Sequence, residues 1–352
     1  MIDWLSSMQQ TYEYYTVDPN TWKDIKRIKN VTKCTIERDS EAETLGSATI
    51  DITESMSECY IRVYLVAIQN GYTYRFPLGT FLVQTQPWSF DGKTKTISVD
   101  AYTPLLELKD KYPTIGYSLL KDDNIMTAAY RLCRENARAP VTETDCSTVL
   151  HYDFVANTDD TWLSFITDLV SNANYKFDLD ELGRIIFLPE QDTTALQPVW
   201  TYNDDNSSIL YPDISLDQDL YGIPNVVEVV YSTGAGYYHA RVVNDDPNSL
   251  ISTVSRGREV VYRDTNPSLN GSPTDAQTQE YAERLLRSLS TVECTVTYSH
   301  GYCPVRVNDC VRLNYTRSGL TGVKAKVIKQ SIDCETSCKV TETAVYTTNL
   351  WR

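Results

Sequence analysis

The sequence predicts a mainly β protein with an α+β insert, in which two small antiparallel β-barrels are separated by an α+β domain. Three observations predict this fold class. Apolar and polar residues alternate with period two through much of the first and last thirds of the chain, which is typical of half-buried strands. Turn pairs such as Asn70-Gly71 and Asp91-Gly92 separate these runs and supply the positive φ angles that tight hairpins need. Between the two β-rich parts, apolar residues recur at helical spacing.

Length and charge limit the classes of protein to consider. A chain of 352 residues is long enough for two or three domains. Its net charge of −15 argues against binding along a nucleic-acid backbone, which requires clustered Lys and Arg. No apolar run approaches the roughly 18 residues of a membrane-spanning helix, and residues 1–20 lack the basic and apolar parts of a signal peptide. We therefore expect no membrane-spanning segment and no secretory route.

The first part of the chain is expected to be an arm followed by a barrel. Residues 1–30 are aromatic without a clear period, and such an arm would pack on a neighbouring part of the chain or on a partner subunit. Residues 31–115 predict the first β-barrel domain from strands spaced about ten residues apart. Alternating apolar residues define its strands: Cys34, Ile36, Ala48, Ile50, Ile52, Cys59, Ile61, Val63, Leu65, Phe81, Val83, Ile97, Val99 and Ala101.

Residues 116–192 predict a small α+β domain of two helices and a hairpin. The segment 116–200 is the most acidic part of the chain, with 14 acidic and six basic residues. A turn at Asp180–Gly183 would join the two strands of the hairpin. The candidate N-caps are Asp123 or Asn124 for the first helix and Asp160 or Thr161 for the second.

The last part of the chain predicts a linker and a second barrel. Residues 193–219 are expected to be the linker, with the polar run 204–208 at its centre. Residues 220–352 contain seven strand-like runs, beginning with the valine-rich run 226–231, whose branched side chains favour strands. These runs predict the second β-barrel domain, with a tight turn at 233–236.

One helix is expected between the strands of the second barrel, over residues 273–290. Ser272 would be its N-cap and Pro273 its first helical residue, followed by an acidic residue in the first turn. Leucines at helical spacing would form its buried face.

The sequence contains no recognisable catalytic motif. None of its three histidines lies in a zinc-protease helix motif, and there is no Gly-x-Ser-x-Gly elbow or phosphate-binding loop. A pair of catalytic carboxylates could hide among the many acidic residues, because one sequence does not give the distance between two side chains. We assign no catalytic and no cofactor-binding residues and expect no cofactor.

Nine cysteines, an odd number, are spread along the chain, unlike the dense disulfide framework of a small secreted domain. Cys334 and Cys338 are spaced closely enough for ligands of structural zinc. Three states stay open for the C-terminal group: buried free thiols, a disulfide or a metal site. The candidate residues are Cys294, Cys303, Cys310, Cys334 and Cys338, with His300 nearby.

Seven segments carry a resemblance to a known family. They are YGIPNVVEVVY (221–231), ARVVNDDP (240–247), GREVVYRDTNP (257–267), YSHGYCPVRV (298–307), WLSFITDL (162–169), GRIIF (183–187) and LGSATI (45–50). With them, the chain resembles the baseplate hub proteins of bacteriophage tails, the late-control-protein-D-like family, in the versions found in phages of Gram-positive and gut bacteria. The resemblance covers nearly the whole chain and concerns fold and role rather than catalysis.

The resemblance implies a homotrimeric ring in which each chain contributes two tube-like barrels. Three chains then present six barrels to a six-fold tail tube and a three-fold face to the spike, and a closed ring ends repeated interfaces without polymerising. The implied partners are the tail tube protein, the spike or tip protein, the tape measure protein and baseplate wedge or peripheral proteins. DNA would be present only in transit during ejection, and an acidic pore would repel its phosphates. The resemblance also implies a late structural protein of the virion, made in the cytoplasm of the bacterial host.

Two alternative functions stay open. The chain could be a tail-associated peptidoglycan hydrolase, although such activity usually belongs to extra domains and the chain is expected to end at Arg352 without one. It could also be a glycan-binding module of the tail tip, because six Trp and 25 Tyr offer rings for stacking on sugars. The same rings would serve equally well in cores and subunit contacts.

Overall fold

In the computed structural model, two compact units make up the protein, and the mainly β fold predicted from the sequence is confirmed. The structure describes residues 2–191, 193, 195–205, 208–233, 236–269 and 273–351. The chain crosses from one unit to the other within three strands, so each unit collects segments that are distant in the sequence. The first unit comprises Met1–Ile214 and Tyr298–Ala344, and the second comprises Ser215–Thr297 and Val345–Arg352.

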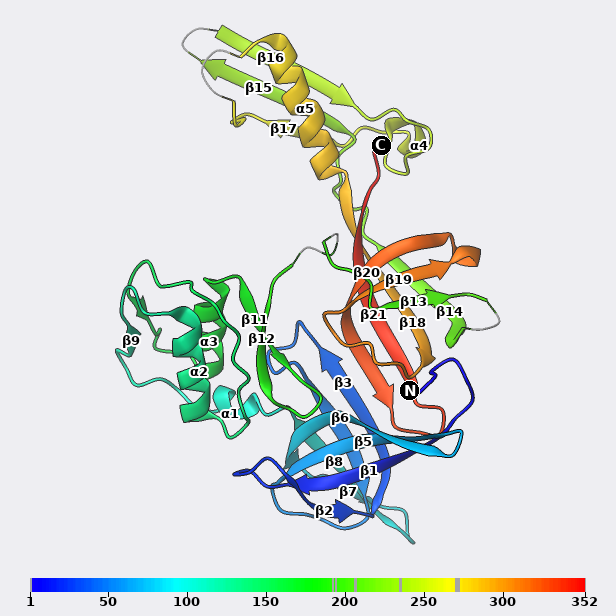
Figure 1. Ribbon diagram of the computed structural model, residues 1–352. Helices are drawn as coiled ribbons and strands as arrows, with labels where there is room; N and C mark the ends of the chain where they lie inside the picture. Colours follow the sequence, from blue (N-terminus) through cyan, green and yellow to red (C-terminus); the bar gives the residue numbers. More distant parts are fainter. Residues whose placement is uncertain are drawn as a thin grey trace. The chain divides into compact units, whose positions relative to one another are not determined.

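A 14-stranded sheet contains most of the strands in the described part of the chain. Its main path follows the order β14-β18-β21-β20-β3-β4-β8-β6-β5-β1-β2, while β7, β13 and β19 pair beside that path (Figure 1). The strands are β1 (Gln9–Val17), β2 (Asp24–Ile28), β3 (Val31–Asp39), β4 (Gly46–Ile52), β5 (Tyr60–Gln69), β6 (Tyr72–Thr85), β7 (Trp88–Phe90), β8 (Lys95–Tyr102), β13 (Trp200–Asn203), β14 (Leu210–Gln218), β18 (Thr291–Gly301), β19 (Cys310–Tyr315), β20 (Leu320–Asp333) and β21 (Lys339–Asn349), and a short 3-10 helix, Thr316–Ser318, follows β19.

The prediction of two closed barrels is not confirmed. No sheet closes on itself within the described ranges, because the main path ends at β2 on one side and at β14 on the other. The pairing of β3 with β20 instead joins the N-terminal strands to the C-terminal strands, from Asp39↔Lys329 to Thr35↔Asp333. Alternation along a strand indicates which face is buried, but it does not indicate which distant strand lies beside it.

Two predicted hairpin turns are confirmed. Asn70 and Gly71 join β5 to β6 with φ of 52° and 80°, and two positive φ angles match the twist of the strands on either side. Gly92, with φ of 94°, lies in the turn between β7 and β8. Both turns form where local residue chemistry requires them.

Residues 1–30 are not an arm, because they contain β1 and β2. β1 pairs with β5 along its whole length, from Gln9↔Ile68 to Val17↔Tyr60, and β2 pairs with the other edge of β1. Aromatic side chains suit a pleated, half-buried surface even when their alternation is imperfect. The imperfect alternation of apolar and polar residues in this segment therefore does not predict the two strands.

The expected linker, 193–219, also contains strands. β13 pairs in parallel with β19, beginning at Trp200↔Val311, and Tyr202 within it is buried. β14 forms one end of the main path. Of the polar run expected at the centre of the linker, Asn206 and Ser207 lie outside the described residues.

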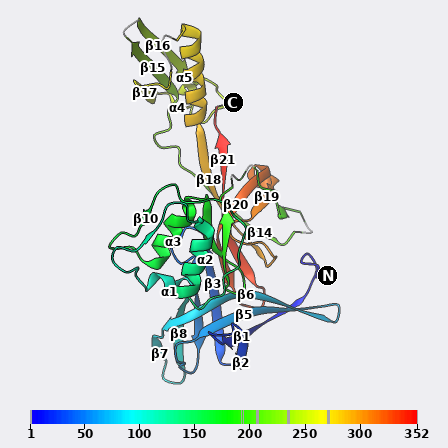
Figure 2. The ribbon, with the colours of Figure 1, turned by 60° about the vertical axis from the view of Figure 1, so that its left-hand side comes forward.

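The two helices and the hairpin predicted for 116–192 are confirmed. Asn124 and Thr161 are the N-caps, and Thr161 forms a reciprocal capping box with Ser164. The helices pack with Tyr60, Leu82 and Trp22 in one core, and they lie side by side in Figures 1 and 2. The elements are α1 (Leu106–Lys109), β9 (Ser118–Leu119), α2 (Ile125–Asn136), β10 (Phe154–Val155), α3 (Trp162–Ser171), β11 (Tyr175–Leu179) and β12 (Ile185–Pro189).

The second unit contains a three-stranded sheet covered by one long helix (Figure 2). Val227 and Val229 of the sheet pack against Ala282 and Leu286 of the helix. The strand runs expected in a second barrel are thus divided between this sheet and the large one. The elements are β15 (Val226–Thr233), β16 (Gly236–Val243), α4 (Thr253–Arg256), β17 (Val261–Asp264) and α5 (Asp275–Leu289), in the sheet order β16-β15-β17, with β17 parallel to β15.

Helix α5 begins later than the sequence predicts. Thr274 is its N-cap, and its side chain accepts the N–H of Gln277 at 3.2 Å, while Gln277 returns a bond in a capping box. Pro273 therefore precedes the cap, and Ser272 lies outside the described residues, as do positions 234–235 of the expected turn. In the part of the chain that the structure describes, no helix is both long and apolar enough to span a membrane.

A buried arginine ties the first strands to the β11–β12 hairpin. Arg62 is 4% exposed and donates to the hydroxyl of Thr80 at 2.8 Å and to the carbonyl of Leu182 at 3.1 Å. Its guanidinium also pairs with Asp24 at 3.0 Å. Because these partners come from β2, β6 and the hairpin turn, one side chain fixes three segments.

We predict that Arg62→Met lowers the free energy of unfolding by about 3 kcal/mol, because it leaves buried acceptors and Asp24 without their donor. Arg27→Met is the matched control, since Arg27 forms an exposed pair with Glu13 and such pairs contribute about 0–1 kcal/mol. Chemical denaturation of both variants measures the difference. Equal losses would contradict the role assigned to Arg62.

Candidate functional site

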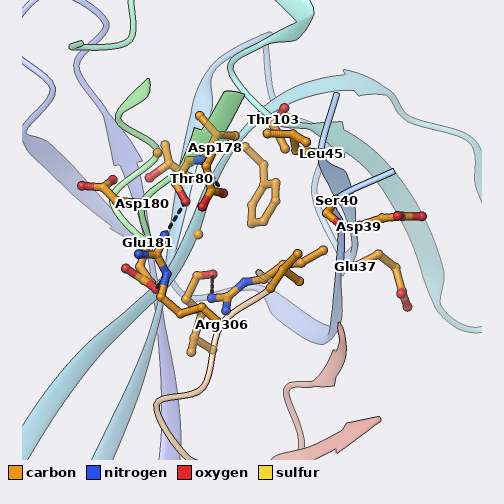
Figure 3. A pocket seen from close by; sticks show the side chains of 17 residues that line it. Glu37, Asp39, Ser40, Leu45, Thr80, Thr103, Asp178, Asp180, Glu181 and Arg306 are labelled. Carbon is orange, nitrogen blue, oxygen red and sulfur yellow. Dashed lines mark hydrogen bonds and ion pairs between the residues drawn. The ribbon is translucent and has the colours of Figure 1, made fainter. Parts of the chain in front are cut away.

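A small pocket of about 50 Å³ lies in the first unit, lined by residues of β3, β6, the β11–β12 hairpin and the segment before β19 (Figure 3). Leu45, Leu78 and Phe81 are among its apolar lining residues, and hydroxyl-bearing and charged side chains line it as well. The charged lining residues are Glu37, Arg38, Asp39, Asp178, Asp180, Glu181 and Arg306.

The hairpin turn that borders the pocket is held closely against β6. Asp180 accepts the N–H groups of Leu182 and Arg184 at 3.0 and 2.8 Å, which closes the turn. Gly183 has φ of 71°, and a Cβ added there would lie 2.7 Å from Cβ of Thr80. Glycine is therefore required at position 183, both for the positive φ and for the close approach.

The electrostatics of the pocket centre on Asp178. Burial raises the pKa of this carboxyl, against the opposing effect of the Arg306 cation. Arg306 donates to the carbonyl of Leu179 at 2.7 Å and pairs with Glu181 at 2.6 Å. No cysteine or histidine lines the described pocket, and the hydroxyl of Ser40 donates to the carbonyl of Ile328.

A second polar group is enclosed in the large sheet of the first unit. Glu342 of β21 and His300 of β18 are 0% exposed, and their Oε1 and Nε2 atoms lie 3.2 Å apart. Tyr298 donates to Oε2 of Glu342 at 2.7 Å, and Gln330 donates to Oε1 at 2.6 Å. Tyr202 completes the group, 3.0 Å from Nε2 of His300. Every polar atom of the carboxylate is thus satisfied.

The surroundings of His300 favour its charged form. Its Nδ1 faces the carbonyl of Gly301 at 2.6 Å and its Nε2 faces a carboxylate at 3.2 Å, so a doubly protonated ring can donate to both acceptors. Burial alone would lower the pKa of His300, but Glu342 and the hydrogen bonds outweigh it and raise the pKa to about 10. The pKa of Glu342 is lowered, because His300 and the donated hydrogen bonds outweigh the cost of burial. The pair is an ionic contact inside the fold.

The candidate cysteines do not converge on one place. All nine cysteines lie in the described ranges and are free thiols, and seven of them are buried. Cys303 lies 3.9 Å from Nδ1 of His300 and 3.2 Å from the hydroxyl of Tyr202. The N–H of Cys334 bonds to the carbonyl of Cys34, and burial raises the pKa of Cys338 to about 12. No group of three metal-ligating side chains occurs among the residues described, those of Cys294 and Cys310 included.

Sequence reasoning named His300 and Cys303 but missed Glu342 and Asp178. Glu342 carried a signal, because it falls on the buried face of β21 between Val340 and Ala344, where an acidic residue needs a partner. Asp178 gave no such signal, since its surroundings come from segments about 100 residues away in each direction.

The comparisons with known proteins bear on the fold of the whole chain. No protein-family model and no curated protein sequence matches it. The tail protein from Neisseria meningitidis MC58 is similar in structure, with a TM-score of 0.60, 13% identity and coverage of 97% of this chain and 98% of that chain. The 43 kDa tail protein of prophage MuSo2 from Shewanella oneidensis is similar with a TM-score of 0.56 and 14% identity. The similarity covers 97% of this chain and 98% of that chain. A chain of the Francisella PdpA–VgrG complex is similar with a TM-score of 0.53 and 10% identity. The similarity covers 98% of this chain and 53% of that chain.

The chain therefore has the fold of these two tail proteins over almost its whole length. At 13% and 14% identity, this similarity shows a shared fold.

We predict a pH-dependent stability from the His300–Glu342 pair. The pKa of His300 rises from 6.5 in the unfolded chain to about 10 in the folded chain, so its contribution is complete below pH 6.5 and is lost as the pH rises toward 10. Glu342 has a lowered folded pKa, so its contribution is present above about 4.5 and is lost in acid. Chemical denaturation should show the free energy of unfolding falling between pH 6.5 and about 7.5.

Glu342→Gln should remove this decrease in the free energy of unfolding, because without the carboxylate burial favours the neutral form of the imidazole. Glu228→Gln is the control, since Glu228 pairs with Arg263 at the surface and titrates only in acid. The two variants are compared between pH 6.5 and about 7.5, because thiols of the unfolded chain titrate around pH 8.5 and add their own pH dependence above that range. An unchanged slope in Glu342→Gln would show that another group carries it.

Proposed function

We propose that this protein is a structural hub of a phage tail baseplate. The similarity to two tail proteins, which spans 97% of this chain and 98% of each of theirs, carries the proposal. A likeness limited to one domain would be compatible with many roles, whereas a shared arrangement over the full length favours a shared place in the tail. The protein would thus be a late product, made in the host cytoplasm and incorporated in the virion.

In the proposed assembly, three copies form a ring that joins a six-fold tail tube to a three-fold spike or tip. The continuous sheet supports this idea, because its N-terminal strands (β1 to β8) and its C-terminal strands (β13, β14 and β18 to β21) are two β-rich halves of one chain. Three chains would then offer six such halves to the tube. The tape measure protein and wedge or peripheral baseplate proteins would be further neighbours.

The negative charge of the chain favours a ring through which DNA passes rather than a surface that binds DNA. A net charge of −15 repels phosphate, and binding along a duplex needs clustered Lys and Arg to replace counterions. DNA would therefore cross the ring during ejection without being held.

We predict that the chain sediments as a homotrimer, either alone or after addition of tail tube and spike proteins. The expected result is a species of about three times the mass of the chain, because a ring with three-fold symmetry closes at three copies. Sedimentation velocity over a range of micromolar concentrations measures it. A monomer under every one of these conditions would contradict the proposed assembly.

We also predict no hydrolysis of host peptidoglycan. The acid, base and thiol that lie together in the first unit, Glu342, His300 and Cys303, are buried and engaged with one another, so a polymer cannot reach them. A turbidity assay on purified cell walls, with a muramidase as positive control, should show no clearing. Clearing that is lost when one carboxylate is changed to an amide would support the hydrolase alternative.

A further inference from the structure

Asp178 lines the pocket, and one oxygen of its carboxylate is buried without a partner among the described residues. The side chain is 8% exposed, and its Oδ1 accepts the N–H of Leu179 at 2.8 Å. Its Oδ2 has no hydrogen-bond partner among the residues described by the structure. Figure 3 shows the carboxylate inside the circle of side chains that line the pocket. A buried acceptor in this state costs free energy that a donor from outside the chain would recover.

The other charged side chains of the pocket are engaged within the chain, so the demand for a donor is concentrated at Asp178. Arg306 in particular is committed to Glu181 rather than to Asp178. The remaining contacts are Asp39 with Lys329, Asp180 with Arg184, Glu37 with the hydroxyl of Ser331, and Arg38 with Gln330 and the carbonyl of Leu78.

The hydrogen bonding of the Asp178 carboxylate indicates which kind of donor fits it. A guanidinium presents a planar fork to two carboxylate oxygens, but Oδ1 of Asp178 is already used by Leu179. A divalent metal ion needs several oxygen ligands, and no group of three ligating side chains is found in the described part of the chain. A single ammonium needs one free oxygen, which Oδ2 provides.

The apolar side chains that line the pocket indicate which chemical group carries the donor. A volume of about 50 Å³ exceeds the roughly 10–15 Å³ that one water needs. Water molecules could satisfy Oδ2, but they would leave Leu45, Leu78 and Phe81 facing solvent, whereas an aliphatic stem would cover these side chains. The pocket therefore fits an amphipathic cation better than water alone.

We propose that this pocket binds a primary alkylammonium group, of the kind at the end of a lysine side chain, with its nitrogen at Oδ2 of Asp178 and its carbon stem against Phe81 and Leu78. The group could belong to a lysine of a neighbouring protein or to a free amine. This inference does not depend on the proposed role in a tail.

The test is a titration of the full chain with n-butylammonium chloride, followed by ligand-observed NMR at constant ionic strength. We expect saturable binding to the unchanged chain and at least about tenfold weaker binding to Asp178→Asn. Tetramethylammonium, which has the charge but no N–H, should not compete. Asp39→Asn is the matched control: Asp39 also lines the pocket but pairs with Lys329 at 2.8 Å, so butylammonium should bind this variant as it binds the unchanged chain.

Thermal unfolding of the Asp178→Asn variant separates a loss of binding from a loss of folding. Asp178→Asn removes an unpartnered buried charge, so its melting temperature should equal or exceed that of the unchanged chain, and lost binding then reports on the site rather than on folding. Nα-acetyl-lysine amide distinguishes the two sources. If it binds at least as tightly as butylammonium, a protein side chain is the ligand, and if butylammonium alone binds, a free amine is. Absence of saturable binding by both probes, or equal binding to Asp178→Asn, would overturn the proposal.

Discussion

The pairing of β3 with β20 is the contact on which the rest of the first unit depends. Five residue pairs join the strands, and the buried Ile36 and Ile332 face each other in the fourth pair. The first two pairs are polar, with Lys329 bonded to Asp39 and Arg38 to Gln330. Cross-strand pairs of this kind contribute about 0.2–1 kcal/mol each. Together they make strands from opposite ends of the sequence parts of one sheet.

That sheet also explains where the polar groups lie. Gln330 of β20 reaches Arg38 on β3 with its carbonyl oxygen and Glu342 on β21 with its amide nitrogen, so the seam is linked to the His300–Glu342 pair. Breaking a buried pair of this type usually costs several kcal/mol, although replacing both partners by well-packed apolar residues is often neutral. Its effect is to specify which strands are neighbours. Arg38 also lines the pocket, so the seam borders the surface where we place a ligand.

Local chemistry was readable from the sequence, and long-range pairing was not. Asn70-Gly71 predicted a hairpin and Asn124 a helix start, because each acts on residues only a few positions away. The pairing of Ile36 with Ile332 joins residues almost 300 positions apart, and alternation fits many such partners equally well. For the same reason, the sequence predicts an arm where β1 lies and a linker where β13 and β14 lie. The pocket could not be predicted at all, since Asp178 gains its character from Leu78, Phe81 and Arg306.

In the proposed role, the protein would have to offer the same contacts in every copy, and closed three-fold symmetry would provide them. Electron microscopy of the purified protein with tail tube protein tests this account most directly, because it reports symmetry as well as mass. The account predicts a three-lobed annulus with a central opening, seated on the end of a tube. Single-copy particles that leave the tube ends bare would contradict it.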